Sequence, residues 1–107
     1  MRMRNNLESD MSVATTILNQ LGGNKFRVMT GAKNFMDHGN ALSMRIGRNS
    51  SNSNYLKITL NDSDLYDVHF SKVTKMGEEK SVREFNDVYN DMLVEIFESH
   101  TGMYTSL

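Results

Sequence analysis

The chain has 107 residues, 38% of them hydrophobic, with 12 basic side chains, 13 acidic side chains and a net charge of −1. This length fits one domain with a modest core, and the composition fits a water-soluble globule. The sequence has no cysteine, which excludes disulfides, thiol catalysis and thiolate metal sites. No stretch reaches the roughly 18 apolar residues of a membrane span, and no apolar signal follows the N-terminal arginines. We therefore expect a cytoplasmic protein that does not bind a membrane.

The charges are unevenly distributed along the chain. Residues 1–60 carry eight bases and three acids, a net charge of +5, whereas residues 61–107 carry four bases and ten acids, a net charge of −6. Either the basic part forms a working surface for an anionic partner, or the two parts attract each other within the fold.

The N-terminal part predicts a leader and a helix. Residues 1–10 are polar and have no apolar period, so we expect a flexible leader followed by a single domain over residues 11–107. Apolar side chains at helical spacing then run from Val13 to Leu21. Ser12 is placed to cap the start of this helix, and Gly22 to end it.

Four segments then alternate apolar and polar side chains with the period of a half-buried strand, at 26–30, 42–46, 55–60 and 66–71. Residues typical of turns separate them, so that Phe35 and Met36 fall in a predicted loop over 32–40. Gly77 predicts another turn, and residues 80–85 a fifth, weaker strand. Short connections between successive strands favour an antiparallel meander.

Helical spacing returns near the C-terminus. Asn86 or Asp87 can cap a helix whose apolar stripe runs from Val88 to Phe97, and Gly102 predicts its end. The predicted fold is α+β: an N-terminal helix, a four- to five-stranded antiparallel meander and a C-terminal helix. Because each element has one apolar face, both helices are expected on one face of the sheet. The other face is then left open.

Patterns of catalytic or metal-binding residues do not emerge. The three histidines have neither the spacing nor the neighbouring acids of a zinc site; they are His38, His69 and His100. The aspartates that begin at Asp62 resemble a calcium loop, but Asp67 and Val73 stand where that loop needs Gly and Glu. We therefore predict a protein that is not an enzyme and that uses no cofactor or metal.

The open face of the predicted sheet is the candidate binding surface. Basic side chains alternate there with an aromatic ring, an arrangement suited to phosphates and stacked bases of single-stranded nucleic acid. The candidate contact residues, including two from neighbouring loops, are Arg27, Lys33, Arg45, Arg48, Tyr55, Lys57 and His69. Alternatively, exposed charges only discourage pairing between sheet edges, and the isoelectric point near 6.3 is low for a dedicated nucleic-acid binder.

Several segments resemble a known family, in the same order and over about residues 13–107. They are NQLGGNKF (19–26), TGAKNF (30–35), DLYDV (64–68), NDVYNDML (86–93) and TGMYTSL (101–107). The chain with these segments resembles a family of small uncharacterised proteins encoded by phages and prophages. The resemblance implies an accessory protein in the cytoplasm of a bacterial host, and it transfers no catalytic residue.

Three functions follow as hypotheses. By analogy with small phage accessory proteins, the first is stoichiometric binding of a host or phage protein, with inhibition of a host defence system as one outcome. The second is nucleic-acid binding through the basic, tyrosine-containing open face. The third is a homo-oligomer that sequesters a nucleotide-type small molecule between subunits.

Overall fold

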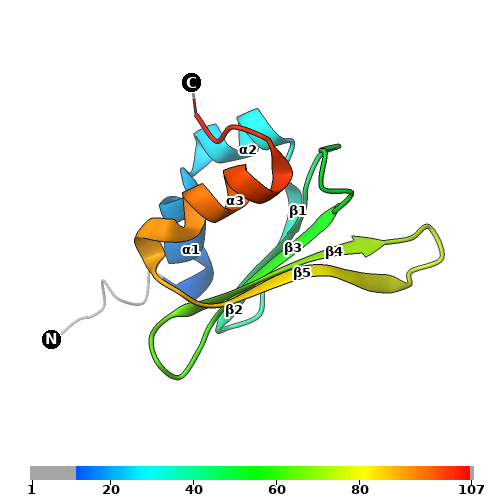
Figure 1. Ribbon diagram of the computed structural model, residues 1–107. Coiled ribbons are helices and arrows are strands. Elements are labelled where there is room, and N and C mark those ends of the chain that lie inside the picture. The colour runs from blue at the N-terminus through cyan, green and yellow to red at the C-terminus, as the bar shows by residue number, and fades with distance from the viewer. Residues whose placement is uncertain (1–11, 107) are drawn as a thin grey trace, which may run out of the picture.

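The computed structural model describes residues 12–106, in which three helices and one 3-10 turn accompany a five-stranded sheet (Figure 1). The predicted leader, residues 1–10, lies outside the described residues. The elements in chain order are α1 (Val13–Leu21), α2 (Asn24–Thr30), β1 (Lys33–Asp37), β2 (Ala41–Arg45), β3 (Tyr55–Leu60), β4 (Tyr66–Val73), β5 (Glu79–Val88), η2 (Asn90–Met92) and α3 (Leu93–Thr101).

The sheet is an antiparallel meander in the order β1-β2-β3-β4-β5. Helices α1, α2 and α3 all lie on one side of it, and the other side is uncovered (Figure 1). The predicted α+β class and meander are therefore confirmed. The predicted fifth strand is present, and at ten residues β5 is longer than the segment expected from the sequence.

The start of α1 follows the prediction. The Ser12 side chain accepts a hydrogen bond from the backbone N–H of Thr15 (3.1 Å), which satisfies one of the unpaired donors of the first turn. At the other end, Gly22 has a positive φ and donates its N–H to the carbonyl of Asn19. The helix then gives way to α2 almost at once.

The predicted strand over residues 26–30 was wrong, because this segment forms α2. Phe26 and Thr30 are four residues apart, so they share one face of a helix as well as one face of a strand. Both are buried, whereas Val28, the third residue of the supposed apolar face, is 74% exposed. Gly31, with φ +71°, ends the helix in the left-handed conformation that glycine favours.

The predicted loop over residues 32–40 was wrong as well, since it contains β1. Lys33 pairs with Arg45, but Met36 rather than Phe35 pairs with Ser43, so the strand holds one extra residue. This irregularity, together with Asn34 at φ 57°, hides the two-residue period. Phe35 packs against the core, and Met36 is 59% exposed.

The C-terminal helix begins later than predicted. Neither Asn86 nor Asp87 caps it, because both lie in β5; α3 starts at Leu93 after the 3-10 turn. Val88 therefore joins the core from a strand and not from a helical stripe. The end of α3 at Gly102, which has φ +76°, agrees with the prediction.

The core lies between the helices and the covered face of the sheet. Three fully buried rings link the layers: Phe26 of α2 is 5.0 Å from Phe97 of α3, and Phe97 is 6.3 Å from Phe70 of β4, between ring centroids. Such contacts between elements that each have one apolar face fix the position of the helices on the sheet. The ends of β2 and β4 near the β2–β3 loop lie outside this core and carry polar and basic side chains.

Candidate functional site

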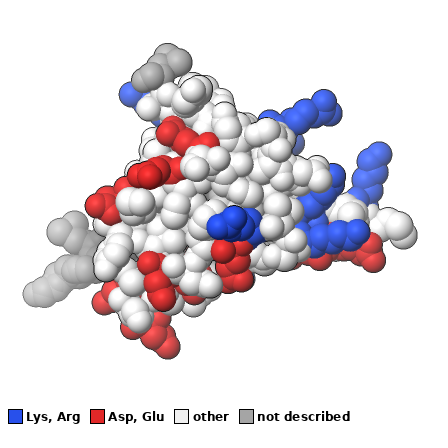
Figure 2. All heavy atoms as spheres, viewed as in Figure 1, with Lys and Arg blue, Asp and Glu red and all other residues white. Residues whose placement is uncertain are grey.

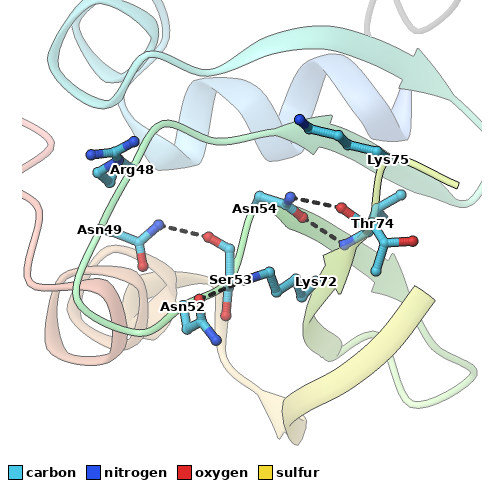
Figure 3. Close-up of a pocket in the computed structure, with 9 residues that line it drawn as sticks. Arg48, Asn49, Asn52, Ser53, Asn54, Lys72, Thr74 and Lys75 are labelled. Carbon is cyan, nitrogen blue, oxygen red and sulfur yellow. Dashed lines mark hydrogen bonds between the residues drawn. The ribbon is translucent and has the colours of Figure 1, made fainter. Parts of the chain in front are cut away.

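A groove opens at the end of the sheet where β2 leads into β3 and β4 leads into β5. One wall is the β2–β3 loop, and the other is the last residues of β4 with the turn that follows (Figure 3). The groove has a volume of about 610 Å³. We call it the basic groove; it is lined by Arg48, Asn49, Asn52, Ser53, Asn54, Lys72, Val73, Thr74 and Lys75.

The β2–β3 loop holds its shape through its own side chains. The Asn49 amide donates to the carbonyls of Gly47 (2.8 Å) and Ser53 (2.7 Å), closing a compact turn. Ser50 anchors the loop on α3, because its Oγ and its N–H both donate to the carbonyl of Thr101 (3.0 and 3.3 Å). This wall of the groove is therefore ordered before any ligand binds.

The loop is tied to the hairpin by two polar links. The Asn54 amide donates to the Val73 carbonyl (2.9 Å), and its Oδ1 accepts from the Val73 N–H (2.7 Å). The Lys72 ammonium donates to Asn52 Oδ1 (2.9 Å), as Figure 3 also shows. These bonds set the spacing between the two walls.

The lining of the basic groove has three cations and no acid. Arg48 comes from the loop, whereas Lys72 and Lys75 come from the end of β4 and its turn (Figure 3). Val73 is the only apolar residue of the lining. Guanidinium and ammonium groups are donors, so this arrangement can bind an anion with several oxygen atoms.

The hairpin of β4 and β5 separates its charges between two faces. Phe70 faces the helices, so alternation places Lys72 on that side, and register adds Lys80 opposite Lys72. The other face carries Glu79, whose carboxylate accepts a hydrogen bond from Ser71 (2.7 Å). In Figure 2 blue atoms gather over this hairpin, with red atoms along its lower side. Cations thus dominate the face that continues the basic groove.

The open face of the sheet brings together four of the residues singled out in the sequence. Arg45 pairs with Tyr55 between β2 and β3, and Lys57 pairs with His69 between β3 and β4. All four are half-buried. Lys33 of β1 pairs with Arg45 at the sheet edge.

Acids and hydroxyls share this open face. Asp67 is the register partner of Thr59, and Glu84 is the register partner of His69. His69 Nε2 lies 2.9 Å from Ser81 Oγ. The open face is therefore of mixed charge, unlike the basic groove.

Two of the predicted contact residues lie elsewhere. Arg27 is on α2 in the helical layer, where its guanidinium lies 5.6 Å from the centre of the Phe35 ring. It cannot act with the open face, because the segment that carries it is a helix and not a strand. Arg48 lies in the basic groove.

Sequence reasoning missed Lys72, Lys75 and Lys80 as site residues. A signal was present, because a hairpin closed at the predicted Gly77 turn places residue 72 opposite residue 80. Arg48 was identified, but its partners lie 24 and 27 positions further along the chain and meet it only through the fold.

A second, apolar hollow of about 300 Å³ lies between β5 and α3. Its exposed members include Tyr89 (64%) and Met92 (36%), beside Phe85, Val88 and Ile96. Next to it, the His100 ring stacks on Phe70 with centroids 4.2 Å apart. Burial lowers the pKa of His100, and the positive charge of Arg83 lowers it further.

Within residues 12–106 no group of three or more acidic or histidine side chains is arranged to hold a metal ion. In the same range, no helix has the length and apolar character to cross a membrane. Comparison with protein-family models, with curated proteins and with solved structures finds no match to this chain.

Proposed function

We propose that the protein binds nucleic acid through the basic groove. The observation that carries this proposal is the lining of three cations from two parts of the chain, without an acid and with Asn, Ser and Thr side chains between them. Phosphate backbones are bound mainly by such Lys, Arg, Asn, Ser and Thr side chains. The overall charge of −1 does not oppose this, because binding depends on the local field at the groove.

A phosphate ligand fits the groove better than an acidic protein does. Protein interfaces depend on aromatic, Met and Arg anchors in desolvated pockets. The basic groove has one apolar residue, Val73, and no aromatic ring. Its charged groups are all cations, as in nucleic-acid interfaces, which are strongly positive.

The test is a titration of fluorescent mixed-sequence DNA, followed by anisotropy over a range of salt concentrations. Three phosphate contacts predict a slope of log K against log salt of about −3. The Lys72→Gln/Lys75→Gln variant is expected to reduce this slope by about two. The matched control, Lys33→Gln/Lys57→Gln, removes the same charge from the open face and its edge, and is expected to keep the slope.

Two results would overturn the proposal. One is an equal loss of affinity in both double variants, which would mean that only the total charge matters. The other is tighter binding of polyglutamate than of DNA, which would identify an acidic protein as the ligand. Urea unfolding of each variant verifies that the fold is intact.

A protein partner is a second candidate, supported by the apolar hollow between β5 and α3. Its exposed Tyr89 and Met92 are residue types enriched at protein interfaces. Binding to a host or phage protein, with inhibition of a host defence system, therefore stays a prediction, as do the phage family and the bacterial cytoplasm. Tyr89→Ala should abolish such binding, which a pull-down from nuclease-treated bacterial lysate measures. The same variant should leave DNA binding unchanged in the anisotropy titration.

A further inference from the structure

The end of the β4–β5 hairpin is a two-stranded ribbon that stands beyond the rest of the sheet. Pairing between β3 and β4 stops at Tyr55 and Ser71, whereas β4 and β5 continue to pair as far as Val73 and Glu79. Figure 1 shows this hairpin extending past the helices and the other strands. We call residues 72–81 the distal hairpin. Its β5 residues are exposed, whereas Lys72 and Val73 of β4 are half-buried where they meet the β2–β3 loop.

The turn of the distal hairpin is fixed by hydrogen bonds. The Thr74 N–H donates to the carbonyl of Glu78 (2.8 Å), and the Gly77 N–H donates to the carbonyl of Thr74 (3.0 Å). Thr74 Oγ1 accepts from the Glu78 N–H (3.2 Å), and Gly77 supplies the positive φ, +88°, that the turn requires. The tip therefore has a defined shape before it meets a ligand.

Met76 occupies the tip of this turn and is 91% exposed, more than any other large hydrophobic side chain in the described residues. Because Met76 does not pack in the core, burial does not explain why an apolar side chain stands at this position. Lys75 precedes it, and the Lys72–Lys80 pair lies behind it on the helix-side face. The distal hairpin also holds Glu78 and Glu79, but the strand face with Lys72 and Lys80 is basic. An apolar tip beyond a basic face suits a ligand whose charged surface surrounds an apolar interior.

Duplex DNA has this arrangement, with phosphates at the rims of a groove and stacked bases at its floor. Its major groove, about 12 Å wide, admits a two-stranded β-ribbon. The deep, narrow major groove of duplex RNA does not admit side chains. Single strands bind on aromatic platforms, and the distal hairpin has no aromatic residue.

We propose that the distal hairpin enters a groove of duplex DNA, with Lys72 and Lys80 at the phosphates and Met76 against the bases. The inference rests on the proposed nucleic-acid binding and names its ligand. The lysines of one face would let the ribbon approach the phosphates on that side, and Glu79 of the other face would point away. In other DNA-binding proteins, apolar side chains such as Met insert between neighbouring base pairs and partly unstack them.

The experiment compares one sequence as duplex DNA, single-stranded DNA and duplex RNA, by anisotropy at a fixed salt concentration. Duplex DNA is expected to bind about tenfold more tightly than the other two, a contrast set by shape and not by charge. Met76→Ala should remove most of that preference and keep the salt slope. Lys72→Gln/Lys80→Gln should lower the slope by about two with duplex DNA.

Each failure has its own signature. Equal or tighter binding of single-stranded DNA overturns the duplex inference and leaves nucleic-acid binding in place. An unchanged duplex preference in Met76→Ala shows that the tip does not reach the bases, and also overturns it. Absence of binding to all three probes overturns the proposed function itself. Because Met76 lies outside the core, unfolding in urea should be unaffected by its replacement, which separates binding from folding.

Discussion

The two halves of the β4–β5 hairpin are both antiparallel, but they differ in register by one residue and in their surroundings, because the pairing shifts between Phe70 and Ser71. In the half near the helices, Phe70 is fully buried against Phe97, and Val68 pairs with Phe85. In the distal hairpin, Lys72 pairs with Lys80 and the side chains reach solvent. One continuous pair of strands therefore anchors the fold at one end and presents charge at the other.

This difference shows how a small domain separates stability from binding. Like charges opposite each other, as at Lys72 and Lys80, disfavour a strand pair. The cost is tolerated because the buried half holds the two strands together, and because neighbouring solvent screens the charges. An anionic ligand would relieve the same repulsion.

The largest expected effect tests the buried half. Phe70→Ala removes a ring in contact with Phe97 and His100, and we expect it to lower the free energy of unfolding by about 3–5 kcal/mol. Met76→Ala in the distal hairpin should change it by no more than about 0.5 kcal/mol. Urea titrations followed by circular dichroism measure both. Similar losses in the two variants would contradict the division between the halves.

The next effect concerns the junction between the halves. Asn54→Ala leaves the N–H and carbonyl of Val73 without their side-chain partner, and we expect a loss of about 1–3 kcal/mol in the free energy of unfolding. Lys72→Ala breaks only the exposed link to Asn52, so its cost should stay below about 0.5 kcal/mol. If the two variants were equally stable, Asn54 would not be what joins the groove walls.

The smallest effect is a dependence of stability on pH through His100. Burial, then Arg83, lowers its pKa below the ordinary 6.5, so the folded protein keeps this ring neutral where the unfolded chain begins to bind a proton. Between the lowered pKa and 6.5 the unfolded state holds more protons. The free energy of unfolding should therefore fall as the pH drops below about 6.5.

The measurement is the urea midpoint at several pH values, in the natural protein and in His100→Gln. The variant lacks the titrating ring, so its midpoint should fall less as the solution becomes acidic. His100 Nε2 also lies 3.3 Å from Ser53 Oγ in the groove wall. An identical pH dependence in both proteins would show that other groups account for it.

The prediction from sequence succeeded where local patterns and tertiary packing agree. The two ends of α1 were predicted correctly, at Ser12 and Gly22, because helix caps depend on hydrogen bonds within a few residues. The sequences of β2, β3 and β4 keep a regular two-residue period, and their apolar positions face the helices, although β2 is buried on both faces from Ala41 to Met44. Their order follows from the short connections between them.

It failed where the pattern was short or interrupted. Over residues 26–30 the same apolar positions fit a strand and a helix, and only burial of Phe26 against Phe97 selects α2. The extra residue in β1 breaks the period that would have indicated a strand. Asn86 and Asp87 have the chemistry of helix caps, but both lie in β5, where Asp87 Oδ1 accepts a hydrogen bond from the side chain of Asn61.

The candidate site was predicted only in part. The pairing of β2, β3 and β4 brings Arg45, Tyr55, Lys57 and His69 together, as their alternation implied. The residues next to Arg48 in the sequence did not indicate that Lys72 and Lys75 would lie in the same groove. This groove depends on a loop anchored on α3 through Ser50 and tied to β4 through Asn54.

The sequence by itself determined the α+β class, the antiparallel meander and the caps of α1, because these depend on side-chain periodicity and on hydrogen bonds between near neighbours. The tertiary structure decided which face each short segment buries, where β5 ends, and which cations share a groove. Those features depend on contacts between residues far apart in the chain. Arg48, Lys72 and Lys75 form one surface only because the loop and the hairpin are held side by side.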